Sequence, residues 1–265
     1  FLWNTQTCQL IGKLDSAYYN NYLFQFSPLV NDCFFYVGRS GVSSHLLTEK
    51  DFLKKKYFSF PCENLVRAMA VTNDGQTLAV GDDRGNIYFV DVVEGSARFW
   101  CKNGTSVYDL RFSPCGKKLF SISSHRNVTC YINCSHSFSC SAPQGYYFTE
   151  IIGFWKDYVV ASDNLGTPHF IDGNENSTQF GKLVFALENS TAPVCVGKEK
   201  IAIARFPSLK IYNSSTEWTE LAVANHTCGV FDWDNNLVLG GRGVYLVNIK
   251  EYKIQVKETN DSLTI

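Results

Sequence analysis

The chain has 265 residues, a formal net charge of −1 and an apolar fraction of 45%. This composition is typical of a globular protein with a buried core and argues against a disordered chain. The near-zero charge gives no reason to expect attraction to nucleic acid or to an anionic membrane, and no apolar run approaches the roughly 20 residues needed to span a bilayer. Aromatic residues, with 20 Phe and 14 Tyr against 1 Met, favour strands over helices.

Strand-like segments separated by polar turns follow one another along the whole chain. Residues 1–14 predict two strands, and Ser262–Ile265 predicts one more. Between them we expect six units of short strands, which begin near Tyr22, Val66, Ser106, Phe148, Pro193 and Thr227. Strands such as Tyr158–Ala161 and Ile201–Ala204 are apolar throughout, so we expect both of their faces to be buried.

Sequence marks recur with a period of about 40 residues. Phe26–Pro28 returns as Phe112–Pro114, two periods later, and Thr72–Gly75 returns as Ser113–Gly116, one period later. Glycines in these polar segments predict tight turns with positive φ. A second mark is a short apolar run that ends in Asp or Asn, and it occurs at Asn4, Asp91, Asn133, Asp172, Asn213 and Asn248. Its missing copy would fall near Leu47–Thr48.

The period, the four short strands per unit and the closing aromatic–Asp pair resemble the WD-repeat family of β-propellers. The resemblance covers the whole chain and is strongest over Val66–Ile132. Only Trp3 keeps the tryptophan of the closing pair and no Gly-His pair opens a repeat, so the family's His–Asp–Ser–Trp hydrogen-bond set is mostly absent. The resemblance implies an all-β, seven-bladed β-propeller of four-stranded antiparallel blades, whose closing blade is shared by the two termini. We expect one such domain over residues 1–265, as an excerpt of a longer protein, since the chain starts at Phe1 without an initiator Met or a signal-peptide pattern.

Arginine is concentrated in one kind of connection. Five of the eight arginines fall between the second and third strands of five different units, namely Arg39, Arg84, Arg126, Arg205 and Arg242. In a propeller all connections of one type lie on the same face, so we predict a ring of guanidinium groups around the channel mouth. Such groups bind carboxylate and phosphate in bidentate fashion, which makes these five the candidate partner-binding residues. The alternative is that they are solvated turn residues, neutralised in part by Asp82, Asp83 and Asp163 in equivalent loops.

No catalytic motif occurs in the sequence, so we expect no enzyme activity, no catalytic residue and no cofactor. An enzyme that uses the central pocket would need converging groups from several blades, for which Asp82–Asp83 is the one visible start. Cys130, Cys134, His136 and Cys140 crowd into one repeat, and zinc accepts such a Cys₃His set. Their spacing belongs to one hairpin, so we expect inert core cysteines and no metal. The short basic run Lys54–Lys56, expected as solvated surface between strands, does not indicate nucleic-acid binding.

Two features disagree about the cellular compartment. The ten cysteines do not recur at the repeat period and a chain of this length needs no stapling, so we expect a cytoplasmic protein with free thiols at Cys130, Cys134 and Cys140. Glycosylation sequons point instead to a lumenal or secreted protein, and they begin at Asn103, Asn127, Asn133, Asn176, Asn189, Asn213, Asn225 and Asn260. Asn, Ser and Thr also crowd into turns, which produces coincidental sequons.

The function implied by the resemblance is that of a non-catalytic protein–protein interaction scaffold. We expect loops on the propeller face to bind a partner protein or peptide, with an acidic or phosphorylated segment as the favoured ligand, within a larger complex. We expect no membrane span and no nucleic-acid partner. The alternatives are a lumenal or secreted glycosylated propeller and an enzyme that uses the central pocket.

Overall fold

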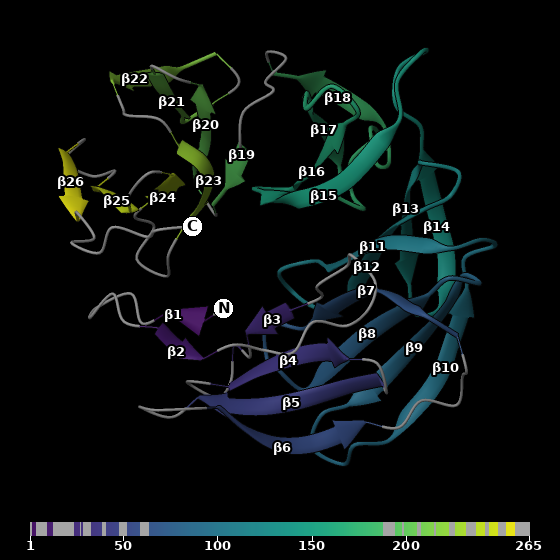
Figure 1. The fold of residues 1–265 in the computed structure, drawn as a ribbon. Coiled ribbons are helices and arrows are strands. Elements are labelled where there is room, and N and C mark those ends of the chain that lie inside the picture. The colour runs from purple at the N-terminus through teal and green to yellow at the C-terminus, as the bar shows by residue number, and fades with distance from the viewer. Residues whose placement is uncertain are drawn as a thin grey trace. The chain divides into compact units, whose positions relative to one another are not determined.

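The structure, a computed structural model, is all-β in the part of the chain that it describes (Figure 1). The described ranges are 2–3, 10–12, 24–26, 28, 33–38, 41–47, 52–58, 64–187, 194–197, 199–205, 208–214, 216–222, 226–231, 237–241, 244–248 and 253–257. In these ranges no helix is long and apolar enough to cross a membrane. The chain divides into two compact units, Phe1–Ser139 and Cys140–Ile265. The single domain over residues 1–265 therefore stays a prediction.

The first unit holds one two-stranded sheet and three four-stranded sheets among its described residues. The small sheet pairs β1 (Leu2–Trp3) with β2 (Leu10–Gly12). The next sheet is formed by β3 (Phe24–Phe26), β4 (Cys33–Gly38), β5 (Gly41–Leu47) and β6 (Phe52–Phe58). It is followed by the sheet of β7 (Val66–Val71), β8 (Thr77–Asp82), β9 (Asn86–Asp91) and β10 (Ala97–Lys102). The third consists of β11 (Val107–Phe112), β12 (Lys118–Ser123), β13 (Val128–Ile132) and β14 (Ser135–Cys140).

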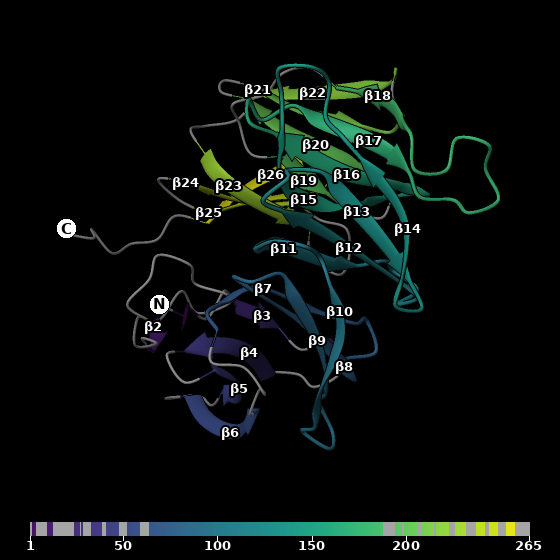
Figure 2. The ribbon, with the colours of Figure 1, turned by 90° about the vertical axis from the view of Figure 1, so that its right-hand side faces the viewer.

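The second unit repeats the same plan in three more sheets of its described residues. The first is formed by β15 (Phe148–Trp155), β16 (Tyr158–Asp163), β17 (Pro168–Asp172) and β18 (Leu183–Ala186). The second contains β19 (Val194–Val196), β20 (Ile201–Arg205), β21 (Ser208–Tyr212) and β22 (Trp218–Ala222). The third contains β23 (His226–Phe231), β24 (Leu237–Gly241), β25 (Val244–Asn248) and β26 (Lys253–Lys257). Within every sheet the strands lie side by side in chain order, as Figure 2 shows for β15 to β18.

The sheets fall where the repeat predicts them. The first strands begin at Phe24, Val66, Val107, Phe148, Val194 and His226, each within two residues of the predicted start. The predicted turn glycines Gly75 and Gly116 have φ values of 66° and 73°. From Asp91 onward, each mark that ends in Asp or Asn ends or directly follows the third strand of its sheet, and at Asp91 the carboxylate accepts the N–H groups of Val93 and Glu94. The strand predicted at residues 262–265 lies outside the described residues, so the count of seven blades stays a prediction.

One local expectation was wrong. The basic run Lys54–Lys56 was expected between strands, but it lies inside β6. This strand is the last in the order of its sheet. Lysine is a common residue on edge strands because its charge discourages pairing with another chain. The run is therefore compatible with a strand at this place.

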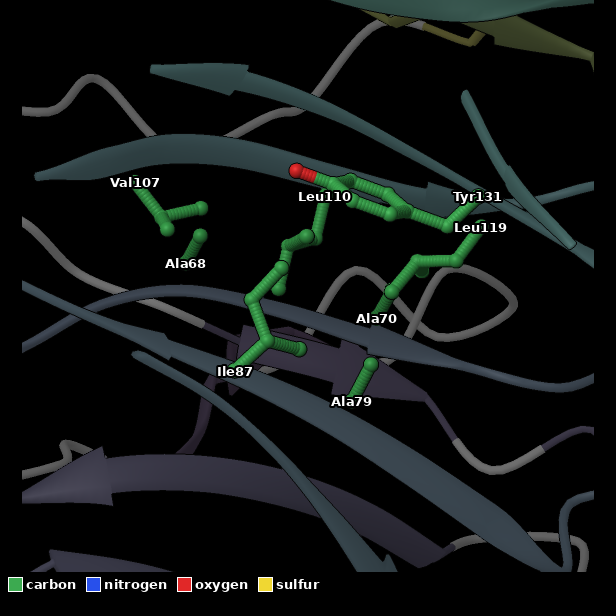
Figure 3. Close-up of a cluster of buried hydrophobic side chains, with 8 residues drawn as sticks. All are labelled: Ala68, Ala70, Ala79, Ile87, Val107, Leu110, Leu119 and Tyr131. Carbon is green, nitrogen blue, oxygen red and sulfur yellow. The ribbon is translucent and has the colours of Figure 1, made fainter. Parts of the chain in front are cut away.

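Neighbouring sheets within a unit pack face to face. Figure 3 shows the cluster between the sheet β7–β10 and the sheet β11–β14, in which Ile87 and Leu110 meet. The other face of the sheet β7–β10 packs on the sheet β3–β6, where Phe35 and Phe58 contact Met69 and Leu78. Both faces of the middle sheet are thus buried, and its second strand β8 is buried at every position after Thr77. In the second unit the sheets β15–β18 and β19–β22 pack in the same way.

Candidate functional site

The turn between β8 and β9 is built around the side chain of Asp82. This carboxylate is 0% exposed. One oxygen, Oδ1, accepts the backbone N–H groups of Arg84 at 2.9 Å and Asn86 at 2.8 Å. The other, Oδ2, accepts the side-chain amides of Asn86 at 2.7 Å and Asn64 at 2.9 Å. Asp82 thereby fixes the turn, and the side chain of Arg84 is left exposed at its tip.

The turn between β16 and β17 uses the same construction. Oδ1 of Asp163 accepts the N–H groups of Leu165 and Thr167, both at 2.9 Å, and Oδ2 lies 2.8 Å from Nε2 of His169. Burial opposes ionisation of this carboxyl group, but the hydrogen bonds from His169, Thr167 and Leu165 outweigh burial and lower its pKa. The residue at the tip of this turn, Leu165, is 44% exposed.

Arg126 lies in the turn between β12 and β13, in an unusual backbone conformation. Its φ is 61°, in the left-handed region that favours glycine. Its N–H donates to the carbonyl oxygen of Ser123 at 2.8 Å. The guanidinium carbon lies 4.7 Å from the centre of the Tyr108 ring, which is within the range of a cation–π interaction.

The hydrogen bonds of these turns place Arg84 and Arg126 at different positions of the turn. Gly85 and Gly166 donate to Asp82 and Asp163 as Arg126 does to Ser123. Arg126 therefore stands where the other two turns have glycine, at φ values of 84° and 81°. Arg84 corresponds instead to His125 and Leu165. The enrichment of arginine belongs to the turn as a whole and not to one repeated position.

The other three predicted arginines are less defined. Arg205 is the last residue of β20, paired with Ser208. Arg39 and Arg242 lie outside the described residues, between β4 and β5 and between β24 and β25. The ring of five therefore stays a prediction. Two of the three acidic residues that could neutralise the arginines, Asp82 and Asp163, are buried and accept hydrogen bonds within their own turns.

The cysteine and histidine cluster does not come together as a metal site in the described residues. Cys130 and Cys140 are buried, whereas Cys134 and His136 are exposed. Burial raises the pKa of the Cys140 thiol to about 11, which disfavours the thiolate that metals bind. Cys134 and Cys140 carry free thiols.

The sequons have mixed exposure. Asn133 and Asn176 are exposed, while Asn103 is half-buried and donates its side-chain amide to Ser121 Oγ at 2.7 Å. Asn189, Asn225 and Asn260 lie outside the described residues.

Comparison with known proteins gives a fold and no family. No family model matches the chain, and no curated protein matches it. Chains of solved structures match in large number, 1667 in all, so a match identifies an architecture and not a particular protein. One is the β-propeller domain of Cps50 (Swd1) from Myceliophteria thermophila, with a TM-score of 0.54 and 14% identity over 72% of this chain and 69% of that chain. Together with the repeated four-stranded antiparallel sheets, this supports a β-propeller fold.

Sequence reasoning missed the role of the buried turn residues. Asp82 and Asp163 were regarded as possible surface charges, although each is the last residue of a largely apolar strand. An Asp or Asn with a Gly three residues later is the available signal, because the short side chain can accept the N–H groups of its own turn. His169 gave no such signal, since its partner depends on the pairing of β16 with β17.

Proposed function

We propose that this protein is a non-catalytic scaffold that binds a partner protein or peptide through the turns between the second and third strands of its sheets. The observation that carries the proposal is the construction of these turns. Buried hydrogen bonds fix the backbone at Asp82 and Ser123, while Arg84 and Arg126 are presented from the turns. A preorganised basic surface binds an acidic or phosphorylated segment with little loss of conformational entropy.

The proposal includes a seven-bladed arrangement in which β1 and β2 share a blade with the strand predicted at residues 262–265. A two-stranded sheet at the start of the chain supports this idea, because a blade of four needs strands from elsewhere in the chain, of which residues 262–265 would supply one. Closure would also remove the exposed edges of that sheet.

We propose a cytoplasmic location and membership of a larger complex. Cysteines that do not recur at the repeat period and the half-buried side-chain amide of Asn103, which donates to Ser121 Oγ, support this location. The exposed Asn133 and Asn176 keep the lumenal glycoprotein as the alternative. Mass spectrometry of the native protein distinguishes the two, since a glycan or a disulfide would favour the lumenal reading.

Of the pair Asp82–Asp83, from which a catalytic site in the central pocket could start, the Asp82 carboxylate is 0% exposed and holds a turn together, so Asp82 is not available to a substrate.

The experiment that tests the proposal is affinity purification of the intact protein from its own cells, followed by identification of what co-purifies. We expect a protein partner in near-stoichiometric amount that dissociates as the salt concentration rises. Recovery of the protein alone at low salt, in repeated preparations, would contradict the proposal.

A further inference from the structure

A polar pocket of about 280 Å³ lies within the first unit, beside the candidate turns. Its walls come from the end of β10 and the turn after it, from the β12–β13 turn, and from β13 and β14. None of its residues belongs to the predicted set of five arginines. The pocket is a separate feature, although His125 in its wall shares a turn with Arg126.

The lining is basic. Lys102, His125 and His136 reach it from three different elements, and the described lining contains no Asp or Glu. Lys102 forms no ion pair with any carboxylate among the described residues. A site with an ammonium group, two imidazoles and no acid favours an anionic ligand.

Hydrogen bonds hold the walls in place. Asn103 donates two hydrogen bonds, from its backbone N–H to Gly85 O at 2.7 Å and from its side-chain amide to Ser121 Oγ at 2.7 Å. Across the pocket, Ser139 Oγ lies 3.0 Å from Nε2 of His136. The ring of His136 meets the ring of Tyr131 edge-on, with 6.2 Å between their centres. The imidazole is therefore positioned before any ligand arrives.

We propose that this pocket binds the phosphate group of a phosphorylated side chain on the partner segment; this deepens the proposed function and rests on it. The volume lies below the roughly 300–1,000 Å³ of pockets that take whole drug-sized ligands, which suits a single side chain. A phosphate monoester brings three acceptor oxygens and a charge of about −1.5 to −2, which match three basic groups from three elements. A carboxylate has two oxygens and one charge, so it satisfies fewer of them. A segment that contacts Arg126 can reach the pocket through the shared turn.

The test uses the intact isotope-labelled protein and three small probes followed by nuclear magnetic resonance at pH 7. The probes are N-acetyl-phosphoserine amide, N-acetylserine amide and N-acetylglutamate amide. We expect saturable shifts at the ring signals of His125 and His136 with the phosphorylated probe, and at least about tenfold weaker binding of the other two. Lys102→Glu and His136→Ala should each weaken the phosphorylated probe by about tenfold or more.

Lys117→Glu is the matched control, because this exposed lysine lies at the other end of β12 and carries the same charge reversal. It should leave binding unchanged, and thermal unfolding verifies that all variants fold. Equal binding of the three probes, unaltered binding by Lys102→Glu, or inorganic phosphate that binds as tightly as the phosphoserine probe would overturn the proposal. None of these measurements needs the partner, so their failure leaves the scaffold proposal standing. Conversely, if the phosphorylated probe binds but no protein co-purifies, the scaffold proposal is wrong and the phosphate-binding pocket stands.

Discussion

At the scale of single residues, the turns between second and third strands combine a buried acceptor with an exposed tip. Asp82 and Asp163 stabilise their turns by accepting N–H groups that would otherwise lose water without gaining a partner. The tips are free to differ, with Arg84 in one turn and Leu165 in another. The buried residues therefore determine stability, and the tip residues determine what the surface can bind.

Asp163→Ala should destabilise the protein by about 2–3 kcal/mol, because the N–H groups of Leu165 and Thr167 lose a charged acceptor. The pKa of Asp163 is lower in the folded protein than its ordinary value of 3.8. The contribution of Asp163 to the free energy of unfolding is therefore complete above its ordinary pKa of 3.8. It is lost as the pH falls through the lower pKa of the folded protein. Denaturant titration of both proteins at pH 7 and at pH 2 measures this. A difference that is the same at both pH values would contradict the assigned role.

Arg126→Gly separates stability from binding. A non-glycine residue in the left-handed region destabilises the folded protein by about 1–2 kcal/mol. The cation–π contact of Arg126 with Tyr108 stabilises it by about 0.5–1 kcal/mol. The variant should be at least as stable as the parent by thermal unfolding, yet bind the partner more weakly. A less stable variant with full binding would make Arg126 a structural residue.

At the scale of elements, the close approach of neighbouring sheets depends on small residues in the second strand. A Cβ atom on Gly81 of β8 would lie 2.7 Å from both Cβ and Cγ1 of Val107 on β11. Side chains attached this near to the backbone cannot rotate away, so the two sheets would have to separate. Sheet-to-sheet packing therefore requires glycine at this position.

Gly81→Ala should destabilise the protein by about 1–3 kcal/mol through overpacking. Combining it with Val107→Ala should cost less than the sum of the two single changes, because the second change removes Cγ1 of Val107, one of the two clashing atoms. Chemical unfolding of the parent, both single variants and the double variant completes the cycle. Strict additivity would show that the sheets do not meet here.

At the scale of the whole molecule, the sequence predicted the repeated sheets well because the repeat period and the turn residues can be read directly along the chain. The starts at Val66 and Phe148 followed from the period and from their apolar strands, and the turn at Gly75 followed from its neighbouring residues. Side-chain partners such as Asp163 with His169 could not be predicted, since they depend on strand register. The pocket at Lys102 and His136 escaped notice for the same reason, because its walls come from separate strands.

Closure of the propeller predicts that the last residues of the chain stabilise the first. Deletion of residues 262–265 should lower the melting temperature, by about 2–4 °C for each kcal/mol lost, because the sheet of β1 and β2 would lose a strand proposed to share its blade. Differential scanning calorimetry of the full and shortened chains gives the answer. An unchanged melting temperature would exclude the shared closing blade.

The most direct test of the account is the affinity of the co-purified partner for a variant with three arginine-to-glutamate changes, at Arg84, Arg126 and Arg242. Its matched control is the triple variant with Glu at the exposed positions Arg98, Lys117 and Lys182, which alters the net charge equally. The account predicts that the turn variant loses affinity by at least about a hundredfold at low salt, while the control stays near the parent and both remain folded at the temperature of the measurement. Equal affinities of the folded turn variant and the folded control would contradict the claim that these turns bind the partner.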